Sequence, residues 1–456
     1  MAHGTEPAAA RSRPVTIGVF GHYGNENLGD EAIVEATIQC VRRRLPDARI
    51  ICFSLRPVDT RARYGLPAYP IRSTVYAGPS HRAEVEEHRR TPDSPSDEDG
   101  SPVGRNALAD RVKAALKGVP VVYQLARWVV SVPRTIRRLG SEFVFLWKSR
   151  AVLQEVDLLF FAGSNQFLDN FGGPWAFPYT VLSWALLAKT TRTRVAFVSV
   201  GAGPLAARLS MMMCRAALAL ADYQSVRDKQ SKALLLGGKQ TALPLVYPDL
   251  AFSLPSVDAE PRARAKPTVG INLMAIYNEG YWHAPDREKY LRYVRTMAEL
   301  AAFVTREGYP TFLFGNQPYD ELVVDDVIQA MTDMGLDPIH VPERAKPCNT
   351  VAEYMEVVRR ADVVIATRFH GIVLALHAHR AVLGVCYGPK CADVLRDMGQ
   401  DGCGLDLDAL CAEDLKRSFL QLVASLEARV EGIRRRHADY RRALDEQYDN
   451  VLKLLA

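Results

Sequence analysis

The chain has 456 residues, of which 48% are hydrophobic and 24% charged, and its formal net charge is +5. This composition is that of a globular protein and excludes a disordered one, and the length exceeds what one ordinary hydrophobic core holds. The first residues lack the apolar stretch of a secretory signal, and no window has the roughly 18 uninterrupted apolar residues of a spanning helix. We therefore expect two domains and a cytoplasmic location.

Short β-rich runs alternate with helical stretches in the first half of the chain. The pattern predicts strands at 15–21, 48–54, 157–163, 194–201 and 223–226, and helices at 29–44, 174–190 and 207–220. This alternation is typical of parallel sheets that are covered by helices on both faces. We take residues 14–255 as an N-terminal Rossmann-like domain.

A second series of the same kind follows a polar, proline-bearing stretch at 256–267, which we interpret as a linker. Its predicted strands are 268–274, 310–315, 338–341, 361–367 and 381–388. The fold class is therefore α/β, with two doubly wound, Rossmann-like domains facing each other across a cleft. The second domain is expected at 268–425, and a C-terminal helix at 426–456 is expected to reach back to the first.

Residues 77–150 interrupt the alternation. Between Arg105 and Arg150 the chain has ten Lys/Arg residues against two acidic ones, so this segment carries a net charge of +8. Residues 118–150 mix these cations with Trp, Phe, Val and Leu, which suits helices in the interface of an anionic membrane. The alternative is an amphipathic hairpin that caps the first domain. Nucleic acid is not expected as a partner, because the segment has no groove-reading motif.

Two loops in the first half are candidates for ligand binding. The stretch "GHYGNENLGDEAI" (21–33) follows the first strand, and its glycines permit a tight turn into a helix that begins near Asp30. Asp30 is equally suited to capping that helix. The stretch "AGSNQFLDNFGG" (162–173) places Asn165 and Asp169 at the carboxyl edge of the sheet, where open α/β proteins bind ligands. A polar loop without a ligand is the alternative there.

Cationic residues recur where later strands end. Arg227 follows the short strand "YQSV" and suits bidentate binding of phosphate or carboxylate, or else an ion pair with Asp228 or Asp249. Arg368 and His370, in "ATRFHG", lie between a strand and a helix, and Lys390 follows the next strand. Together these cations would form a pocket for a compact, multiply charged anion. For His370 alone, packing near a helix start is the alternative.

These segments together resemble the polysaccharide pyruvyl transferase family. The likeness lies in "GHYGNENLGDEAI", "SVRDKQS", "YPDLAF" and "TRFHGIVLALHAHRAVLGVCYGPK", and it extends from Val15 to about Leu420 without the 77–150 insert. It implies a fold like that of GT-B glycosyltransferases, phosphoenolpyruvate as donor, and transfer of a pyruvyl group to a sugar as a ketal. The acceptor would be a cell-surface polysaccharide or a lipid-linked glycan, and its site would be in the first domain.

The resemblance also implies roles for individual residues. Arg368 and His370 match the family's Arg-x-His motif, and Arg227 and Lys390 match its other cations. The family's amino-terminal Asn and Gly-Asp correspond to Asn27, Gly29 and Asp30.

On this interpretation His370 protonates the methylene carbon of phosphoenolpyruvate while Arg227, Arg368 and Lys390 hold its carboxylate and phosphate. No metal and no cofactor beyond this co-substrate are expected. A glycosyltransferase using a nucleotide sugar, and a non-catalytic glycan-binding or membrane scaffold protein, remain as alternatives. The expected location is cytoplasmic or peripheral on the inner face of a membrane. The sequence leaves open whether the chain forms a homo-oligomer.

Overall fold

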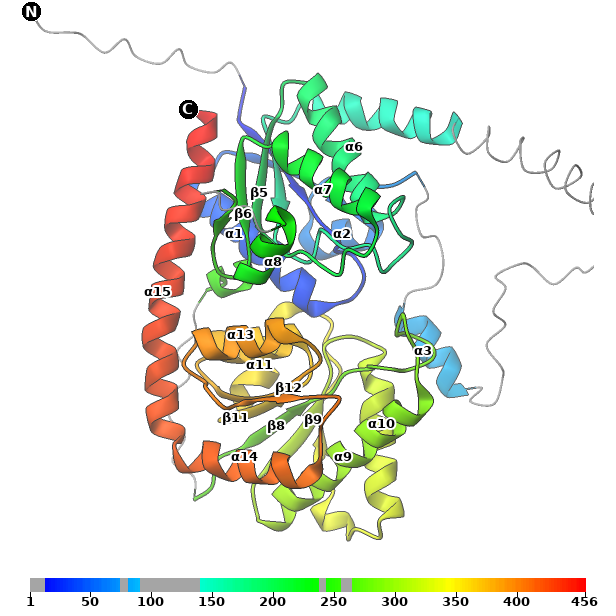
Figure 1. The fold of residues 1–456 in the computed structure, drawn as a ribbon, viewed down its shortest axis with the longest axis vertical. Helices are drawn as coiled ribbons and strands as arrows, with labels where there is room; N and C mark the ends of the chain where they lie inside the picture. Colours follow the sequence, from blue (N-terminus) through cyan, green and yellow to red (C-terminus); the bar gives the residue numbers. More distant parts are fainter. Residues whose placement is uncertain (1–12, 74–80, 91–139, 238–242, 256–264) are drawn as a thin grey trace, which may run out of the picture.

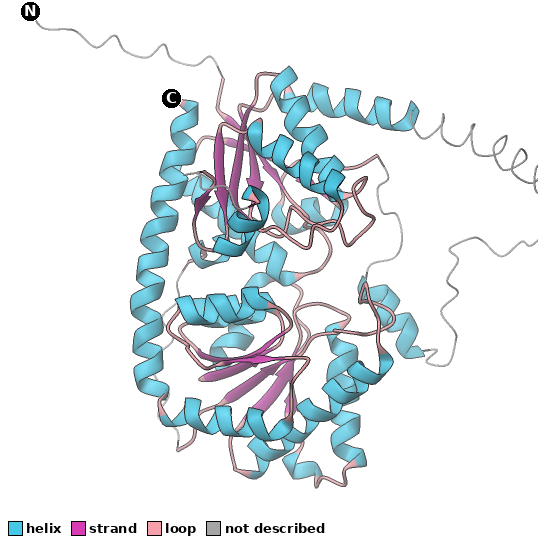
Figure 2. Ribbon diagram, viewed as in Figure 1, coloured by secondary structure: helices cyan, strands magenta, loops and turns pink. Residues whose placement is uncertain are grey.

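Two parallel β-sheets, one in each half of the chain, organise the computed structural model (Figure 1). The structure describes residues 13–73, 81–90, 140–237, 243–255 and 265–456. Helices cover both faces of each sheet (Figure 2), and separate hydrophobic clusters fill the two faces. The prediction of two doubly wound α/β domains is therefore confirmed.

The first sheet has seven strands in the order β3-β2-β1-β4-β5-β6-β7. They are β1 (Thr16–Phe20), β2 (Arg49–Ser54), β3 (Ala68–Pro70), β4 (Leu158–Ala162), β5 (Arg194–Val200), β6 (Tyr223–Val226) and β7 (Leu245–Val246). The central strands are nearly continuous apolar runs, such as "LLFFA" in β4, because both faces of a parallel sheet are buried.

Helices join these strands by crossovers. They are α1 (Leu28–Arg44), α2 (Pro57–Tyr64), α3 (His81–Arg90), α6 (Phe177–Thr190), α7 (Arg208–Ala219), α8 (Lys229–Leu236) and the 3-10 helix η1 (Leu250–Ser253). Residues 140–153 are also helical. Helix α3 reaches the second domain, because the Tyr319 hydroxyl donates a 2.5 Å hydrogen bond to Glu84.

The second sheet has six parallel strands in the order β10-β9-β8-β11-β12-β13. They are β8 (Val269–Asn272), β9 (Thr311–Phe314), β10 (Glu343–Arg344), β11 (Val363–Ala366), β12 (Ala381–Cys386) and β13 (Gly404–Asp406). The helices are α9 (Arg287–Arg306), α10 (Asp320–Asp333), η2 (Pro338–His340), α11 (Val351–Arg360), α12 (Phe369–His377), α13 (Pro389–Asp397) and α14 (Ala412–Ala424).

The C-terminal helix α15 (Leu426–Leu452), followed by η3 (Lys453–Leu455), runs along both domains (Figure 1). Near its end Arg44 donates to Asp445 at 2.8 Å and to Asp449 at 2.7 Å, which ties it to α1. Nearer its start, His437 contacts His377 of α12 at 3.0 Å. The helix therefore connects the two domains over its whole length.

One predicted strand is wrong. Within the expected strand 338–341 ("PIHV"), residues Pro338–His340 form the 3-10 helix η2, because the Asp337 carboxylate accepts from the Ile339 amide and starts a turn. The edge strand in this region is β10, a few residues later. Most of the expected linker and the greater part of the basic insert, including residues 118–139, lie outside the described residues, so the domain boundaries stay predictions.

Candidate functional site

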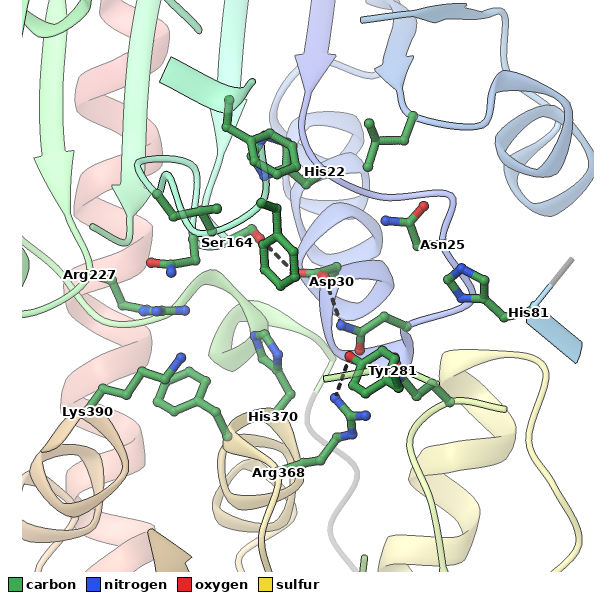
Figure 3. A pocket seen from close by; sticks show the side chains of 18 of the residues that line it. His22, Asn25, Asp30, His81, Ser164, Arg227, Tyr281, Arg368, His370 and Lys390 are labelled. Carbon is green, nitrogen blue, oxygen red and sulfur yellow. Dashed lines mark hydrogen bonds between the residues drawn. The ribbon is translucent and has the colours of Figure 1, made fainter. Parts of the chain in front are cut away.

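A cavity of about 420 Å³ lies between the two domains, where the carboxyl ends of both sheets face each other (Figure 3). Its lining comes mainly from segments that follow β1, β2, β3, β4 and β6 in the first domain and β8, β9, β11 and β12 in the second. The four residues singled out for the donor, namely Arg227, Arg368, His370 and Lys390, all line it. The structure thus brings together side chains that are up to 163 positions apart in the sequence.

Arg227 lies directly after β6, with its guanidinium over the Phe369 ring, 4.5 Å from the ring centroid. Its Nη1 donates to Asp249 at 3.1 Å, and Asp228 lies 3.7 Å from its Nε. Burial opposes the charge, but these carboxylates outweigh burial and raise the pKa of Arg227. The expected ion pair with Asp249 is therefore present, and Arg227 also lines the cavity, while its binding of an anion stays a prediction.

Arg368 is the N-cap residue of α12, and two nitrogens of its guanidinium donate to the same carboxylate. Its Nε and Nη2 each donate to Asp320 at 2.6 Å, while Nη1 approaches the Tyr281 hydroxyl at 3.4 Å (Figure 3). Asp320 also accepts from two backbone amides, so its own position is fixed. These contacts use one N–H of Nη1 and one of Nη2, which leaves one N–H on each nitrogen for a ligand.

Lys390 is partly buried and lies over two aromatic rings, 5.3 Å from the centroid of Phe369 and 5.1 Å from that of Tyr387. Burial lowers the pKa of Lys390, and the neighbouring charge of Arg227 lowers it further. Within the described part of the chain, no carboxylate lies at salt-bridge distance from its Nζ. An anion bound here would relieve both effects.

His370 is the second residue of α12 and packs against the start of α1. A Cβ added to Gly29 would overlap the His370 imidazole, so glycine is required where the two helices meet. The Nε2 atom of His370 lies 3.7 Å from the Asp249 carboxylate. Although burial opposes it, the charges of His370 and Arg227 and the hydrogen bond from the Ala251 amide lower the pKa of Asp249. One buried carboxylate thus faces both the imidazole and an arginine.

The first-domain side of the cavity is polar. Asn27, and not Asp30, is the N-cap of α1, since its side chain accepts from the Gly29 amide at 3.1 Å; the capping alternative for Asp30 is wrong. Asp30 accepts from Asn27 at 2.9 Å and from the Ser164 hydroxyl at 2.7 Å (Figure 3). Asn165 lines the cavity beside them and donates to the Gly203 carbonyl at 2.6 Å.

Asp169 does not line the cavity, which corrects its assignment to an acceptor loop. Its two carboxylate oxygens accept from the amides of Ala206 and Ala207, at 3.0 and 2.9 Å. These amides directly precede α7, so the carboxylate holds the start of that helix. Hydrogen bonds from these amides outweigh burial and lower the pKa of Asp169.

Sequence reasoning did not assign several residues that the structure adds to the site. Asp320 and Tyr281 hold Arg368, and Asp249, which was expected only as an ion-pair partner of Arg227, also lies beside His370. Asp249 is part of "YPDLAF", a segment that carried part of the family resemblance, so the motif could have indicated that Asp249 belongs to the site. His22 and Arg72 also line the cavity. Each lies two positions after the end of a strand, and this position could have identified both as candidates for the site.

Two searches of the described residues complete the description. None of their helices is both long and apolar enough to cross a membrane. Within the same residues, no group of three or more His, Cys, Asp or Glu side chains is arranged to hold a metal ion.

Comparison with solved structures places the fold. A putative UDP-N-acetylglucosamine 2-epimerase from Listeria monocytogenes is similar with a TM-score of 0.52 and 11% identity, over 92% of this chain and 91% of that one. A glycosyltransferase from Rickettsia africae is similar with a TM-score of 0.52 and 8% identity, over 97% and 99%. At such identities the likeness concerns the fold alone, which is the two-domain, GT-B-like fold. No curated protein matches the sequence.

The family comparison is more specific. The sequence profile described as polysaccharide pyruvyl transferase matches residues 27–389, a range that includes Asn27, Arg227, His370 and reaches almost to Lys390. The match covers most of the chain and both sides of the cavity. The chain therefore belongs to the polysaccharide pyruvyl transferase family.

Proposed function

We propose that this chain transfers the pyruvyl group of phosphoenolpyruvate to a sugar of a cell-surface polysaccharide or lipid-linked glycan, as a ketal, with release of phosphate. The observation that carries the proposal is the convergence of Arg227, Arg368 and Lys390 around His370 in one interdomain cavity. Membership in the family supports a saccharide acceptor.

The donor fits the charges of this half of the cavity. Phosphoenolpyruvate has a carboxylate and a phosphate on a three-carbon frame, and three cations on separate loops suit two such groups. Lys390 and the remaining N–H groups of Arg368 are the groups that gain most from a bound anion. Since side chains match each negative group of the donor, the proposed reaction uses no metal and no further cofactor.

The chemistry begins with a proton. Phosphoenolpyruvate becomes electrophilic at C2 when its methylene carbon is protonated, and we assign that proton to the His370 imidazolium. The Asp249 carboxylate, 3.7 Å from Nε2, stabilises this positive charge. A sugar hydroxyl then adds to C2, phosphate leaves, and a second hydroxyl of the same sugar closes the ketal; the two hydroxyl protons balance the proton given to the carbon and the one taken by phosphate or solvent.

On the acceptor side, we propose that Asp30, Asn27 and Asn165 bind sugar hydroxyls. Asp30, in the first turn of α1, and Asn165, in the loop after β4, belong to the first domain and line the same cavity as the donor cations. Carboxylate and amide groups are suited to hydroxyl donors and acceptors. Gly29 has a different part, since it lets α1 approach His370.

The test is phosphate release from phosphoenolpyruvate in the presence of a glycan extract, with a mass gain on the acceptor as second readout. His370→Ala should lower turnover by about 10²- to 10⁴-fold, the usual range for general acid catalysis. Turnover within a few-fold of the wild type would remove His370 from the chemical step. Release of a nucleotide from sugar donors would favour a glycosyltransferase instead, and ligand binding without turnover would favour a glycan-binding or scaffold protein.

We also propose a cytoplasmic location at the inner face of a membrane. Phe143, Val144 and Trp147, on the helical residues 140–153, are 67%, 50% and 67% exposed. On the same helix Phe145 packs toward Trp184 of α6, so the apolar residues are on both its inner and its outer side. Aromatic side chains beside cations such as Lys148 suit an interface with anionic lipid.

A further inference from the structure

The cavity extends beyond the donor cations to a second group of side chains in the first domain. His22, two residues after β1, and Arg72, two residues after β3, line its far end together with Phe177 at the start of α6. Figure 3 shows His22 well apart from Arg227 and Lys390, toward the first domain. The volume of about 420 Å³ is within the range of roughly 300–1000 Å³ that holds drug-sized ligands, so there is room for more than a three-carbon donor.

Arg72 is a partly buried cation without a carboxylate partner. Its Nε donates to the Thr180 hydroxyl at 3.1 Å, and its guanidinium lies over the Phe177 ring at 4.2 Å from the centroid. Its Nη2 is buried and has no hydrogen-bond partner. Considering the described residues only, no Asp or Glu oxygen comes within salt-bridge distance of it. Burial lowers the pKa of Arg72 and outweighs the charge of Glu142, which raises it, so this cation is held out of water without full compensation.

His22 is beside it and is also unsatisfied. The side chain is 7% exposed, its ring lies against Phe177 with 3.7 Å between centroids, and its Nε2 has no hydrogen-bond partner. Burial first, and then the charge of Arg72, lower the pKa of His22 well below its ordinary value. A neutral imidazole of this kind can donate one N–H to an anion. Phe177 contacts both side chains and fixes their positions.

The sheet order separates this group from the donor cations. β3 and β6, which precede Arg72 and Arg227, are five strand spacings apart in the order β3-β2-β1-β4-β5-β6. At about 4.8 Å per spacing the end of β3 is on the order of 24 Å from that of β6 along the sheet edge, and the end of β1, which precedes His22, is on the order of 14 Å from it. A molecule as small as phosphoenolpyruvate does not reach across either of these distances. The second group therefore needs a different anion.

We propose that Arg72 and His22 bind an anionic group carried by the acceptor saccharide, either a phosphate ester or a carboxylate. This inference rests on the proposed function, because it assumes that an acceptor occupies the first-domain side of the cavity. The sugar would lie between this anion site and the donor, with its reacting hydroxyls toward His370. A neutral sugar would leave the Arg72 charge buried and uncompensated, so the site selects charged acceptors.

The experiment is isothermal titration calorimetry on the full-length protein saturated with phosphoenolpyruvate. The probes are glucose 1-phosphate, glucuronate and glucose. We expect at least one of the charged sugars to bind roughly tenfold or more tightly than glucose, since hydrogen bonds to charged groups typically contribute that much. The stronger of the two charged probes identifies phosphate or carboxylate as the preferred group.

Arg72→Gln should lose this tenfold preference and keep its affinity for phosphoenolpyruvate, which also shows that the variant is folded. Arg208→Gln, an exposed arginine at the start of α7, is the matched control and should behave as wild type. Equal affinity of wild type and Arg72→Gln for both charged sugars would overturn the inference. Failure of the wild type to bind phosphoenolpyruvate would contradict the proposed donor instead, and the Arg72 comparison is then made without it.

Discussion

The Asp249 carboxylate lies 3.7 Å from the Nε2 atom of His370; the aspartate side chain is 2% exposed and the histidine side chain 13%. The same carboxylate accepts a hydrogen bond from Arg227 at 3.1 Å. Asp249, which is the N-cap residue of η1, thus orients an imidazole of the second domain and a guanidinium of the first. The ion pair thus links the group that we assign to proton transfer with one that we assign to donor binding.

Asp249→Asn should lower kcat for phosphate release by about 10²-fold, because a neutral amide no longer stabilises the imidazolium. The same substitution should cost much less in the His370→Ala background, since residues that act as a unit are not additive. The measurement is steady-state phosphate release for the two single variants and the double variant. Asp228→Asn is the control, because Asp228 is near Arg227 but caps α8. If the losses in kcat of the two single variants add up in the double variant, Asp249 and His370 do not act together.

Gly29→Ala should reduce turnover by about 10²-fold and destabilise the fold by about 1–3 kcal/mol. The new Cβ would overlap the imidazole of His370, and a displacement of about 1 Å can cost that much in rate. Phosphate release and thermal unfolding measure the two effects. Gly432→Ala in α15 is the control, since a Cβ there meets no atom within 4 Å and should leave activity unchanged. Wild-type turnover in Gly29→Ala would show that His370 tolerates the shift.

Glu31 gives a prediction for pH. Burial raises its pKa to about 7, against opposing contributions from Arg63 and the Tyr64 hydroxyl. A carboxyl whose pKa is higher in the folded state costs stability as the pH rises from its unfolded pKa to the folded value. Relative to wild type, Glu31→Gln should therefore gain about 3 kcal/mol of unfolding free energy between pH 4.5 and pH 8.

Urea unfolding at several pH values measures this gain. Glu431→Gln, at an exposed position of α15, is the control and should show no such trend. A constant difference between Glu31→Gln and wild type over this pH range would contradict the raised pKa.

The double substitution Phe143→Ser with Trp147→Ser should weaken binding to vesicles that contain phosphatidylglycerol by more than tenfold. Burial of one large apolar side chain contributes about 1.5–3 kcal/mol, and both are exposed in the protein. Vesicle sedimentation, with phosphatidylcholine vesicles for comparison, measures it. Ile339→Ser, 81% exposed on the second domain, is the control. Unchanged binding would assign these aromatic residues to a contact other than lipid.

The sequence pattern predicted the central strands well because both faces of a parallel strand are buried and its residues form one apolar run. β4 and β12 are examples in which every residue is buried. The pattern failed at 338–341, where apolar residues follow an Asp-Pro pair that starts a turn. Edge strands such as β3, with three residues, are too short to show a period.

The candidate site was predictable to the extent that ligands bind at the carboxyl ends of parallel strands. This rule placed Arg227, Arg368, His370 and Lys390 at one cavity. It does not say which carboxylate meets which cation, because Asp249 and Asp320 reach their partners only through the tertiary fold. It also assigned Asp169 to ligand binding, whereas the chain uses that carboxylate to hold a helix.

Helix α15 has 27 residues, so at about 1.5 Å per residue it is some 40 Å long. Its final turns are held by Arg44 and its earlier turns by Arg436, which donates to the Asp397 carbonyl, and by His437. A rotation that moves the two sheets apart would break one of these two sets of contacts, so α15 restrains the relative motion of the two domains. Substrates would then enter and products leave through small rearrangements of loops, while the angle between the two domains stays nearly constant.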